Sequence, residues 1–299
     1  MRAIGIDGGG SYTRFVLFDE KKGVINSYII KEPSNYHLVG VKKVKNVFKE
    51  GIERVSDGKY DVVGAGLSGV DREKDMEIIS SIFKEINVEK VVISNDALSA
   101  LWGALNGVGI LMIAGTGSIV LARNESGKVE RAGGWGYMFE EYCSGFWFAN
   151  KAAIAALEFR DGMGPFTTLK EKLPSFYGLS KIEDLIYLYY SNFKKSKIAS
   201  AAIIVFEEAQ KGDEVARRIV EKGIENALKM IEAVQKKCDF SDDFNFSYTG
   251  GIFNSRFFLE SMKKAFYARF AKAKFVSPKF GADVGAAIMA MEKMKNKDL

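Results

Sequence analysis

The stretch Ile4-Gly5-Ile6-Asp7-Gly8-Gly9-Gly10-Ser11-Tyr12-Thr13-Arg14 decides how this 299-residue chain begins to fold. The apolar residues before the aspartate predict a strand over residues 3–7, the glycines predict a turn, and residues 12–19 predict a second strand. A Walker A loop would need Gly-Lys-Ser/Thr, and a Rossmann fingerprint would open a helix where this sequence opens a strand. The stretch is therefore either a plain hairpin turn or a loop whose glycines let backbone N–H groups approach a phosphate.

The same succession of strand, polar glycine-rich turn and strand occurs again farther along the chain. A short apolar strand at 109–114 is followed by Gly115-Thr116-Gly117-Ser118, a strand at 119–123 and a third strand near Val129. The first copy likewise has a third strand, at 24–30. Two copies of one pattern about 105 residues apart predict an internal duplication.

The rest of the pattern predicts an α/β protein of two domains. We expect an N-terminal domain of residues 1–105, joined by a returning C-terminal helix within 282–299, and a larger domain of residues 106–281 with a helical insertion at 144–237. The other expected helices lie at 38–56, 73–85, 97–105, 255–270 and 282–294, and the other expected strands at 61–66, 90–94, 244–248 and 274–276.

Composition excludes several classes of protein. The net charge is only +5, and the densest basic run, Lys194-Lys195-Ser196-Lys197, is interpreted as a solvated loop and not as a nucleic-acid arm. No apolar stretch reaches the roughly 18 residues of a membrane span, and the N-terminus runs directly into a strand. The two cysteines, Cys143 and Cys238, match no zinc pattern, and two reduced thiols are favoured over one disulfide. We therefore expect a cytoplasmic protein that binds neither nucleic acid nor membrane.

A third glycine-rich turn, Tyr248-Thr249-Gly250-Gly251-Ile252, lies between a predicted strand and a predicted helix. Backbone N–H groups at such a place favour a nucleotide or another anion. Each of the three turns, taken alone, is equally consistent with an ordinary connection between elements.

Together, in this order, the three turns resemble the phosphate-one, phosphate-two and adenosine motifs of the actin-like ATPase superfold, whose domains are ribonuclease-H-like. Further motifs make the chain similar to the N-acetylglucosamine kinases, to the related BadF/BadG-type ATPase family and to an archaeal broad-specificity hexokinase. The resemblance extends from residue 4 to about residue 290. The motifs that carry it are Pro33-Ser34-Asn35-Tyr36-His37, Gly66-Leu67-Ser68-Gly69-Val70-Asp71, Ser94-Asn95-Asp96-Ala97, Gly133-Gly134-Trp135-Gly136 and the segment Pro278 to Ala287.

This resemblance implies ATP and Mg²⁺ as cofactors. Asp7 would organise Mg²⁺ through water, and Thr116 would approach the γ-phosphate. The residues that the resemblance places at the nucleotide are Asp7, Gly8, Gly9, Gly10, Ser11, Thr13, Gly115, Thr116, Gly117, Ser118, Gly250 and Gly251.

The resemblance also implies that Asp96 is the catalytic base. Phosphoryl transfer needs a group that accepts the proton of the acceptor hydroxyl, and an aspartate is ionised at neutral pH. The alternative is that Asp96 is an ordinary helix N-cap. Trp135 either stacks on a sugar or packs in the core, and His37 is interpreted as structural. The residues expected near the sugar are Asn35, Ser68, Gly69, Asn95, Trp135 and Glu141.

One departure from the kinase pattern concerns the sugar pocket. The kinases follow Gly-Gly-Trp-Gly with Asp-Glu-Gly-Ser, whose aspartate contacts the sugar, whereas this chain has Glu141-Tyr142-Cys143-Ser144. We expect a kinase for a hexose or amino sugar, N-acetylglucosamine above all, and by analogy a homodimer. The alternatives are an ATPase that activates a partner enzyme through a cysteine-bound iron–sulfur cluster, and a nucleotide- or sugar-binding regulator without catalysis.

Overall fold

The structure, a computed structural model, describes residues 1–296. The last three positions of the expected returning segment 282–299 lie outside the described residues. The chain divides into two compact units. Unit 1 comprises Met1–Gly109 together with the C-terminal segment from Ser277, and unit 2 comprises Ile110–Val276. From the sequence, the divisions were expected at 105/106 and 281/282.

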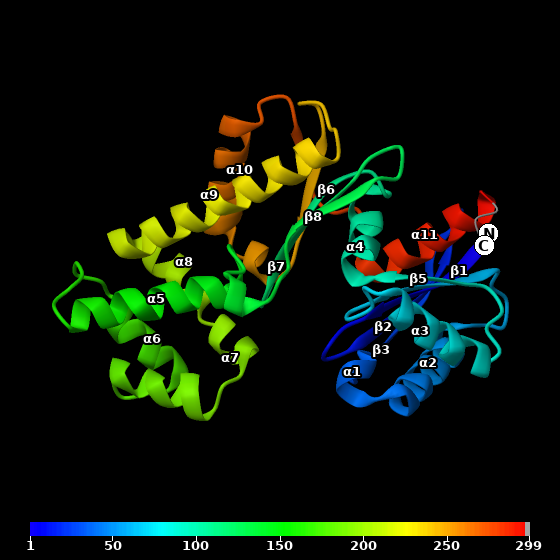
Figure 1. The fold of residues 1–299 in the computed structure, drawn as a ribbon, viewed down its shortest axis with the longest axis horizontal. Coiled ribbons are helices and arrows are strands. Elements are labelled where there is room, and N and C mark those ends of the chain that lie inside the picture. Colours follow the sequence, from blue (N-terminus) through cyan, green and yellow to red (C-terminus); the bar gives the residue numbers. More distant parts are fainter. Residues whose placement is uncertain (297–299) are drawn as a thin grey trace. The chain divides into compact units, whose positions relative to one another are not determined.

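Unit 1 is built on a five-stranded mixed sheet (Figure 1). Its strand order is β3-β2-β1-β4-β5; β1, β2 and β3 pair antiparallel, and β1, β4 and β5 pair parallel. Asp7, the penultimate residue of β1, pairs with Gly66 of β4, so the residues that follow these two parallel strands gather at one edge of the sheet. The strands are β1 (Arg2–Gly8), β2 (Thr13–Asp19), β3 (Gly23–Ile30), β4 (Val62–Leu67) and β5 (Val91–Asn95).

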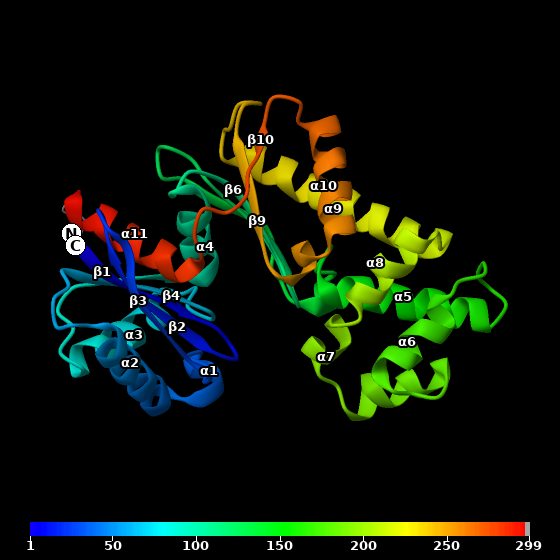
Figure 2. The same cartoon turned by 180° about the vertical axis from the view of Figure 1, so that it is seen from behind.

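Helices cover both faces of this sheet, as Figures 1 and 2 show. Alternate residues of β1 point to opposite faces: Ile4 and Ile6 pack with α2 (Val41–Val55) and α3 (Glu73–Glu85), while Ala3 packs with α11 (Ala282–Lys295). The single helix expected at 38–56 is two helices, because Gly40 between them has φ 78°, outside the helical region. The remaining helices of this unit are α1 (Tyr36–Val39) and α4 (Asp96–Leu105).

The C-terminal helix α11 returns to the first sheet and packs against it at very short range. A Cβ added at Gly5 would lie 1.9 Å from the carbonyl oxygen of Asp283, and one at Gly64 would lie 2.0 Å from that of Ala286. Only glycine allows so close an approach of strand and helix backbones. This contact brings Asp283 to the sheet edge where Asp7 lies.

Unit 2 repeats this plan with its own sheet, of order β10-β9-β6-β7-β8. With β6 taken as the counterpart of β1, the two sheets have the same strand order, which confirms the internal duplication and the two-domain α/β fold. The strands are β6 (Gly109–Ala114), β7 (Ser118–Arg123), β8 (Val129–Gly133), β9 (Asn245–Thr249) and β10 (Lys274–Phe275).

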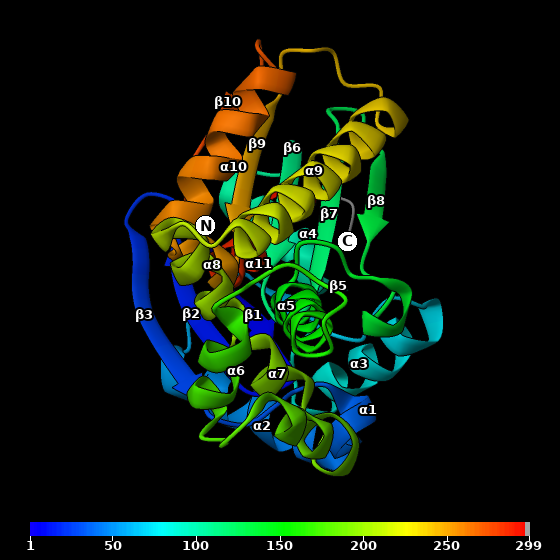
Figure 3. The same cartoon turned by 90° about the vertical axis from the view of Figure 1, so that its left-hand side faces the viewer.

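The helices of unit 2 enclose a large aromatic and alanine-rich core. Figure 3 shows α9 and α10 side by side along the second sheet. Both cysteines are buried in this unit as free thiols, as expected from the sequence. None of the helices in the described part of the chain is long and apolar enough to cross a membrane. The helices are α5 (Gly145–Arg160), α6 (Leu169–Tyr177), α7 (Lys195–Ala199), α8 (Ala202–Lys211), α9 (Glu214–Lys237) and α10 (Arg256–Arg269), with short turns η1 (Tyr137–Phe139), η2 (Ile182–Asp184), η3 (Tyr187–Ser191) and η4 (Gly251–Asn254).

Candidate active site

The carboxylate of Asp7 lies half-buried at the end of β1. Its pKa is raised to about 6, mainly by burial and also by the nearby carboxylates of Asp283 and Asp96, while Arg14 opposes the shift. An acidic group whose pKa is raised by burial and by like charges gains from a cation placed beside it. The carboxylates at this end of unit 1 therefore favour the binding of a cation.

The glycines after Asp7 differ in what they do. A Cβ at Gly8 would lie 2.2 Å from Ser34 Oγ, so this position must be glycine for packing, whereas Gly9 and Gly10 face no such obstacle. Ser11 is exposed at the turn. The hydroxyl of Thr13, which the resemblance placed at the nucleotide, is buried and donates to the carbonyl oxygen of Glu32 at 2.9 Å. The Thr13 side chain therefore stabilises the β2–β3 hairpin and is not accessible to a ligand.

Asn95, and not Asp96, is the N-cap of α4. Its Oδ1 accepts a hydrogen bond from the backbone N–H of Leu98 at 2.8 Å, so the alternative that Asp96 caps the helix is wrong. Burial raises the pKa of Asp96; the backbone N–H of Ala97 opposes this shift, and the Asp71 carboxylate adds to it. Asp96 is therefore a better proton acceptor than an ordinary surface aspartate.

Three residues expected near the sugar lie together in unit 1. A Cβ at Gly69, where φ is 82°, would lie 2.7 Å from Asn35 Nδ2, so the amide of Asn35 packs directly over this glycine. The backbone N–H of Ser68 donates to the carbonyl oxygen of Gly8 at 2.8 Å. The loops after β3 and β4 thereby meet the turn after β1.

Sequence reasoning missed the residue that ties these loops together, Asp75. Its buried carboxylate accepts hydrogen bonds from the Tyr36 hydroxyl at 2.5 Å and from Arg72 Nε at 3.2 Å, and His37 Nε2 lies 3.5 Å away. The hydrogen bonds from Tyr36 and Arg72 hold the pKa of Asp75 well below its usual range. Its position three residues after the N-cap Arg72, where an acidic side chain can close a capping box, is the signal that could have indicated it.

In unit 2, the turn after β6 rests on the beginning of α5. The carbonyl oxygens of Gly115 and Thr116 accept hydrogen bonds from the backbone N–H groups of Gly145 (2.7 Å) and Phe146 (3.3 Å). Ser118, another predicted nucleotide residue, is buried, and its hydroxyl donates to the carbonyl oxygen of Tyr142 at 2.6 Å. Ser118 thus fixes the turn, while Thr116 is exposed at its tip.

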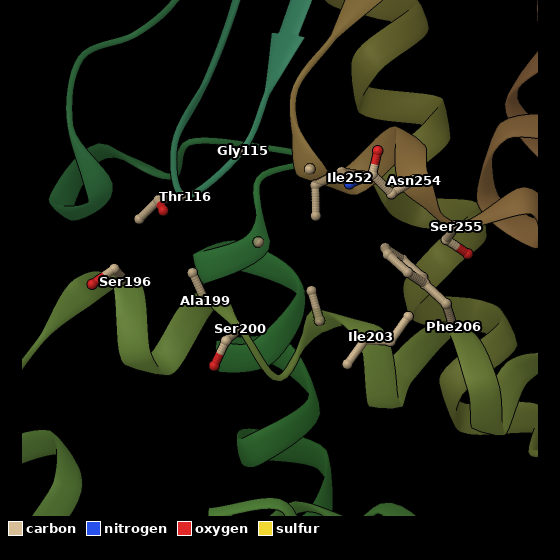
Figure 4. A pocket seen from close by; sticks show the side chains of 13 residues that line it. Gly115, Thr116, Ser196, Ala199, Ser200, Ile203, Phe206, Ile252, Asn254 and Ser255 are labelled. Carbon is tan, nitrogen blue, oxygen red and sulfur yellow. The ribbon is translucent and has the colours of Figure 1, made fainter. Parts of the chain in front are cut away.

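A cavity of about 430 Å³ opens beside this turn (Figure 4). It brings together Gly115 and Thr116, the α7 residues Ser196 and Ala199, and the turn after β9. A Cβ at Gly115 or Gly251 would meet no protein atom within 4 Å, so these glycines leave the space empty and the fold does not require them there. The remaining lining residues are Gly145, Ser200, Ala202, Ile203, Phe206, Ile252, Asn254 and Ser255.

Glu141 lies against the same turn. Its Oε2 forms an ion pair with Lys195 Nζ at 2.5 Å, and its Oε1 accepts from the backbone N–H of Gly136 at 3.2 Å. A Cβ at Gly117 would lie 2.9 Å from Glu141 Oε2. The basic run at 194–197 was expected to be a solvated loop; that interpretation is wrong for Lys195, which begins α7 and is half-buried in this ion pair.

Trp135 lies 65% exposed, so the alternative that it packs in the core is wrong. The guanidinium of Arg131 covers one face of its ring at 4.1 Å. Two neighbouring non-glycine residues, Glu140 and Cys143, have left-handed backbone angles (φ 56° and 64°). Cys143 thus adopts a left-handed conformation at the position where the kinase pattern described above has glycine.

Comparison with known proteins identifies the family and the fold of the chain. The model of the BadF/BadG/BcrA/BcrD ATPase family matches residues 4–290. The chain is 33% identical to an N-acetyl-D-glucosamine kinase of Dictyostelium discoideum, with 98% of each chain covered. It is 32% identical to an N-acetylmuramic acid/N-acetylglucosamine kinase of Clostridium acetobutylicum, covering 96% of this chain and 97% of the other. The solved structure of a putative N-acetylglucosamine kinase from Chromobacterium violaceum superposes with a TM-score of 0.77 at 22% identity, covering 97% and 98% of the two chains, and has the same fold.

Proposed function

The chain belongs to the BadF/BadG/BcrA/BcrD ATPase family, and we propose that it is an ATP-dependent sugar kinase whose acceptor is N-acetylglucosamine. The observation that carries the proposal is Asp96: a half-buried carboxylate with a raised pKa, left out of the helix cap. The chain is also similar, over nearly its full length, to an N-acetyl-D-glucosamine kinase and to an N-acetylmuramic acid/N-acetylglucosamine kinase. In such a reaction the protein positions the reactants, neutralises charge and accepts one proton.

Asp96 would accept the proton of the sugar hydroxyl as that oxygen attacks the γ-phosphate. Its raised pKa makes the carboxylate more basic while the hydroxyl becomes more acidic in the transition state. Asn35, Ser68, Gly69 and Asn95 would bind the sugar, since they lie around the same end of the unit 1 sheet. In unit 2, Trp135 would offer an exposed ring for stacking on a sugar. A sugar contact by Glu141 is less well supported, because its two carboxylate oxygens already bind Lys195 and the backbone N–H of Gly136.

ATP would occupy the unit 2 cavity, with its phosphates at Gly115 and Thr116 and its nucleoside toward Gly251. The open space at Gly115 and Gly251 supports this placement, because an added side chain would take room that the fold leaves free. In unit 1, Gly9 and Gly10 leave room for a ligand and Ser11 is exposed, which fits the resemblance of the first turn to a phosphate-binding motif.

Asp7 fits Mg²⁺, a hard cation that prefers oxygen ligands and retains several waters. Burial, and then the nearby carboxylates of Asp283 and Asp96, raise the pKa of Asp7. A bound Mg²⁺ would supply charge neutralisation for the phosphates and would hold Asp7 in its ionised form.

The alternative that the chain is an ATPase activating a partner enzyme through an iron–sulfur cluster is less well supported. Iron–sulfur clusters at a shared interface need accessible thiolates, whereas both cysteines of this chain are buried, and burial raises the pKa of each thiol. Two free thiols and the use of ATP fit a cytoplasmic enzyme. A homodimer follows from analogy with related kinases and belongs to the same proposal.

The test is sugar-dependent release of ADP from Mg²⁺-ATP. The acceptors would be N-acetylglucosamine, glucose, glucosamine, N-acetylmannosamine and N-acetylmuramic acid, with the phosphorylated product identified by mass spectrometry. We expect N-acetylglucosamine to have the highest kcat/KM of the panel and to yield a monophosphate of that sugar. ADP release that no sugar increases would contradict the kinase and favour the activator or the regulator.

A further inference from the structure

We propose that Lys195 binds the terminal phosphates of ATP and that Glu141 holds it in place beside the phosphate-two turn. The inference rests on the proposed function in one respect, that the ligand of the unit 2 cavity is ATP. Neither residue was assigned this role by the sequence: the lysine was interpreted as solvated, and the glutamate as a sugar ligand.

The geometry places the ammonium group next to the turn. Lys195 Nζ lies 2.5 Å from Glu141 Oε2, and that same oxygen lies 2.9 Å from the position a Cβ would take on Gly117. The next residue of α7, Ser196, lines the cavity together with Gly115 and Thr116, as Figure 4 shows. Glu141 Oε2 therefore links the ammonium to Gly117, in the turn expected to receive the phosphates.

The surroundings hold both side chains in this orientation. Glu141 is 9% exposed and Lys195 is 27% exposed, and the backbone N–H of Gly136 donates to the second carboxylate oxygen. Lys195 Nζ also lies 5.6 Å from the ring centroid of Tyr137, which packs against Phe146 and Phe193. Two of the three donor hydrogens of the ammonium remain for other acceptors, since the carboxylate oxygen takes one.

Charge explains why the two residues would act as a pair. A carboxylate alone against a phosphate turn repels ATP, and the lysine cancels that repulsion while adding a cation. Removing Lys195 would leave Glu141 uncompensated at the turn, which harms phosphate binding more than the loss of one contact. Removing both charges would therefore restore part of the affinity, a non-additivity that a double-mutant cycle measures.

The experiment is calorimetric titration of the full chain with Mg²⁺-AMPPNP, Mg²⁺-ADP and AMP, without sugar. The variants are Lys195→Met, Glu141→Gln, the double variant, and Lys197→Met as a matched control on the exposed face of the same helix. We expect Lys195→Met to weaken AMPPNP binding roughly 10- to 100-fold, as for a charge-assisted hydrogen bond, and AMP binding less than about twofold. The double variant should bind AMPPNP more tightly than Lys195→Met, and Lys197→Met should bind it like the parent protein.

Two results would overturn the inference. One is AMPPNP affinity unchanged in Lys195→Met, with its thermal unfolding midpoint also unchanged. The other is an equal loss for AMP and AMPPNP, which would indicate distortion of the whole cavity. The titration contains no sugar, so its result does not depend on whether the chain phosphorylates one. An error in the proposed kinase activity can therefore be told apart from an error in the role proposed for Lys195.

Discussion

Asn95 caps helix α4 through its Oδ1, 2.8 Å from the backbone N–H of Leu98, and so leaves the carboxylate of Asp96 out of the cap. The two adjacent residues therefore have separate roles, one in capping the helix and one in carrying the candidate base. Asn95 contributes to stability, and Asp96 bears a carboxylate whose pKa burial raises at the expense of stability.

These separate roles predict that Asp96→Asn lowers kcat without lowering the free energy of unfolding, whereas Asn95→Ala lowers the free energy of unfolding. Asp96→Asn should lower kcat roughly 10²- to 10⁴-fold, the range for a lost general base. Because the pKa of Asp96 is raised in the folded state, its ionisation opposes folding above the unfolded pKa of about 3.9. Asp96→Asn should therefore unfold in urea at pH 7 with a free energy no lower than that of the parent. Asn95→Ala should lose about 1 kcal/mol of unfolding free energy. A stable and fully active Asp96→Asn would exclude Asp96 as the base.

The acid limb of the pH–rate profile should respond to Asp71. Its carboxylate is exposed and helps raise the pKa of Asp96. Asp71→Asn removes that negative charge but keeps an oxygen that can accept from Asn95 Nδ2, 3.4 Å away in the parent. The pKa of Asp96 should fall, so kcat/KM should persist to lower pH than in the parent. Profiles of kcat/KM for the sugar measure this, with Glu73→Gln, another exposed acid nearby, as control. A limb that moves to higher pH would contradict the assignment of the base.

Two consecutive glycines in unit 2 should behave differently when changed to alanine. A Cβ at Gly250, where φ is 107°, would lie 2.3 Å from the carbonyl oxygen of Ala114, while a Cβ at Gly251 meets nothing within 4 Å. Gly250→Ala should destabilise the protein by about 2 kcal/mol or more. Gly251→Ala should change the unfolding free energy by less than about 0.5 kcal/mol. It should nevertheless raise the Kd for AMPPNP roughly tenfold, about 1.4 kcal/mol, because the methyl group enters the ligand space. Unfolding curves and titrations of both variants separate the two effects; unchanged AMPPNP binding by Gly251→Ala would place the nucleotide elsewhere.

Local patterns predicted most of the fold, because each sheet is assembled from short apolar strands with glycine turns whose signals are local. The helix at 38–56 was predicted as one because its periodicity continues past Gly40, and only the backbone shows the interruption. The sequence predicts Asp96 as the base only through the motif around it, and whether Asn95 or Asp96 caps the helix depended on a hydrogen bond that either side chain can make.

The residues that sequence reasoning missed make contacts between distant positions. Lys195 meets Glu141 across 54 positions, and Asp75 meets Tyr36 across 39. A basic run that looks solvated has the same composition whether or not one lysine turns inward. Such pairings depend on how helices dock, which periodicity does not report.

Replacing Asp75 should change the positioning of the sugar-binding loops and not the chemical step. Its carboxylate binds Tyr36 and Arg72, and Tyr36 follows Asn35, the residue expected to bind the sugar. Asp75→Asn should loosen these loops and raise the KM for the sugar more than it lowers kcat, while the KM for ATP stays near the parent value. Glu73→Gln, on the same helical turn, should leave all three unchanged.

The same substitution should change the pH dependence of stability. Because hydrogen bonds from Tyr36 and Arg72 depress the pKa of Asp75 in the folded state, the ionised carboxylate stabilises the protein above its unfolded pKa of about 3.9. That contribution is lost as the pH falls below this value toward the folded pKa. Urea unfolding should therefore show a deficit for Asp75→Asn at pH 7 that shrinks below about pH 4. A deficit that is constant from pH 7 to pH 3, with unchanged KM for the sugar, would mean that Asp75 contributes only packing and does not hold the sugar loops through its charge.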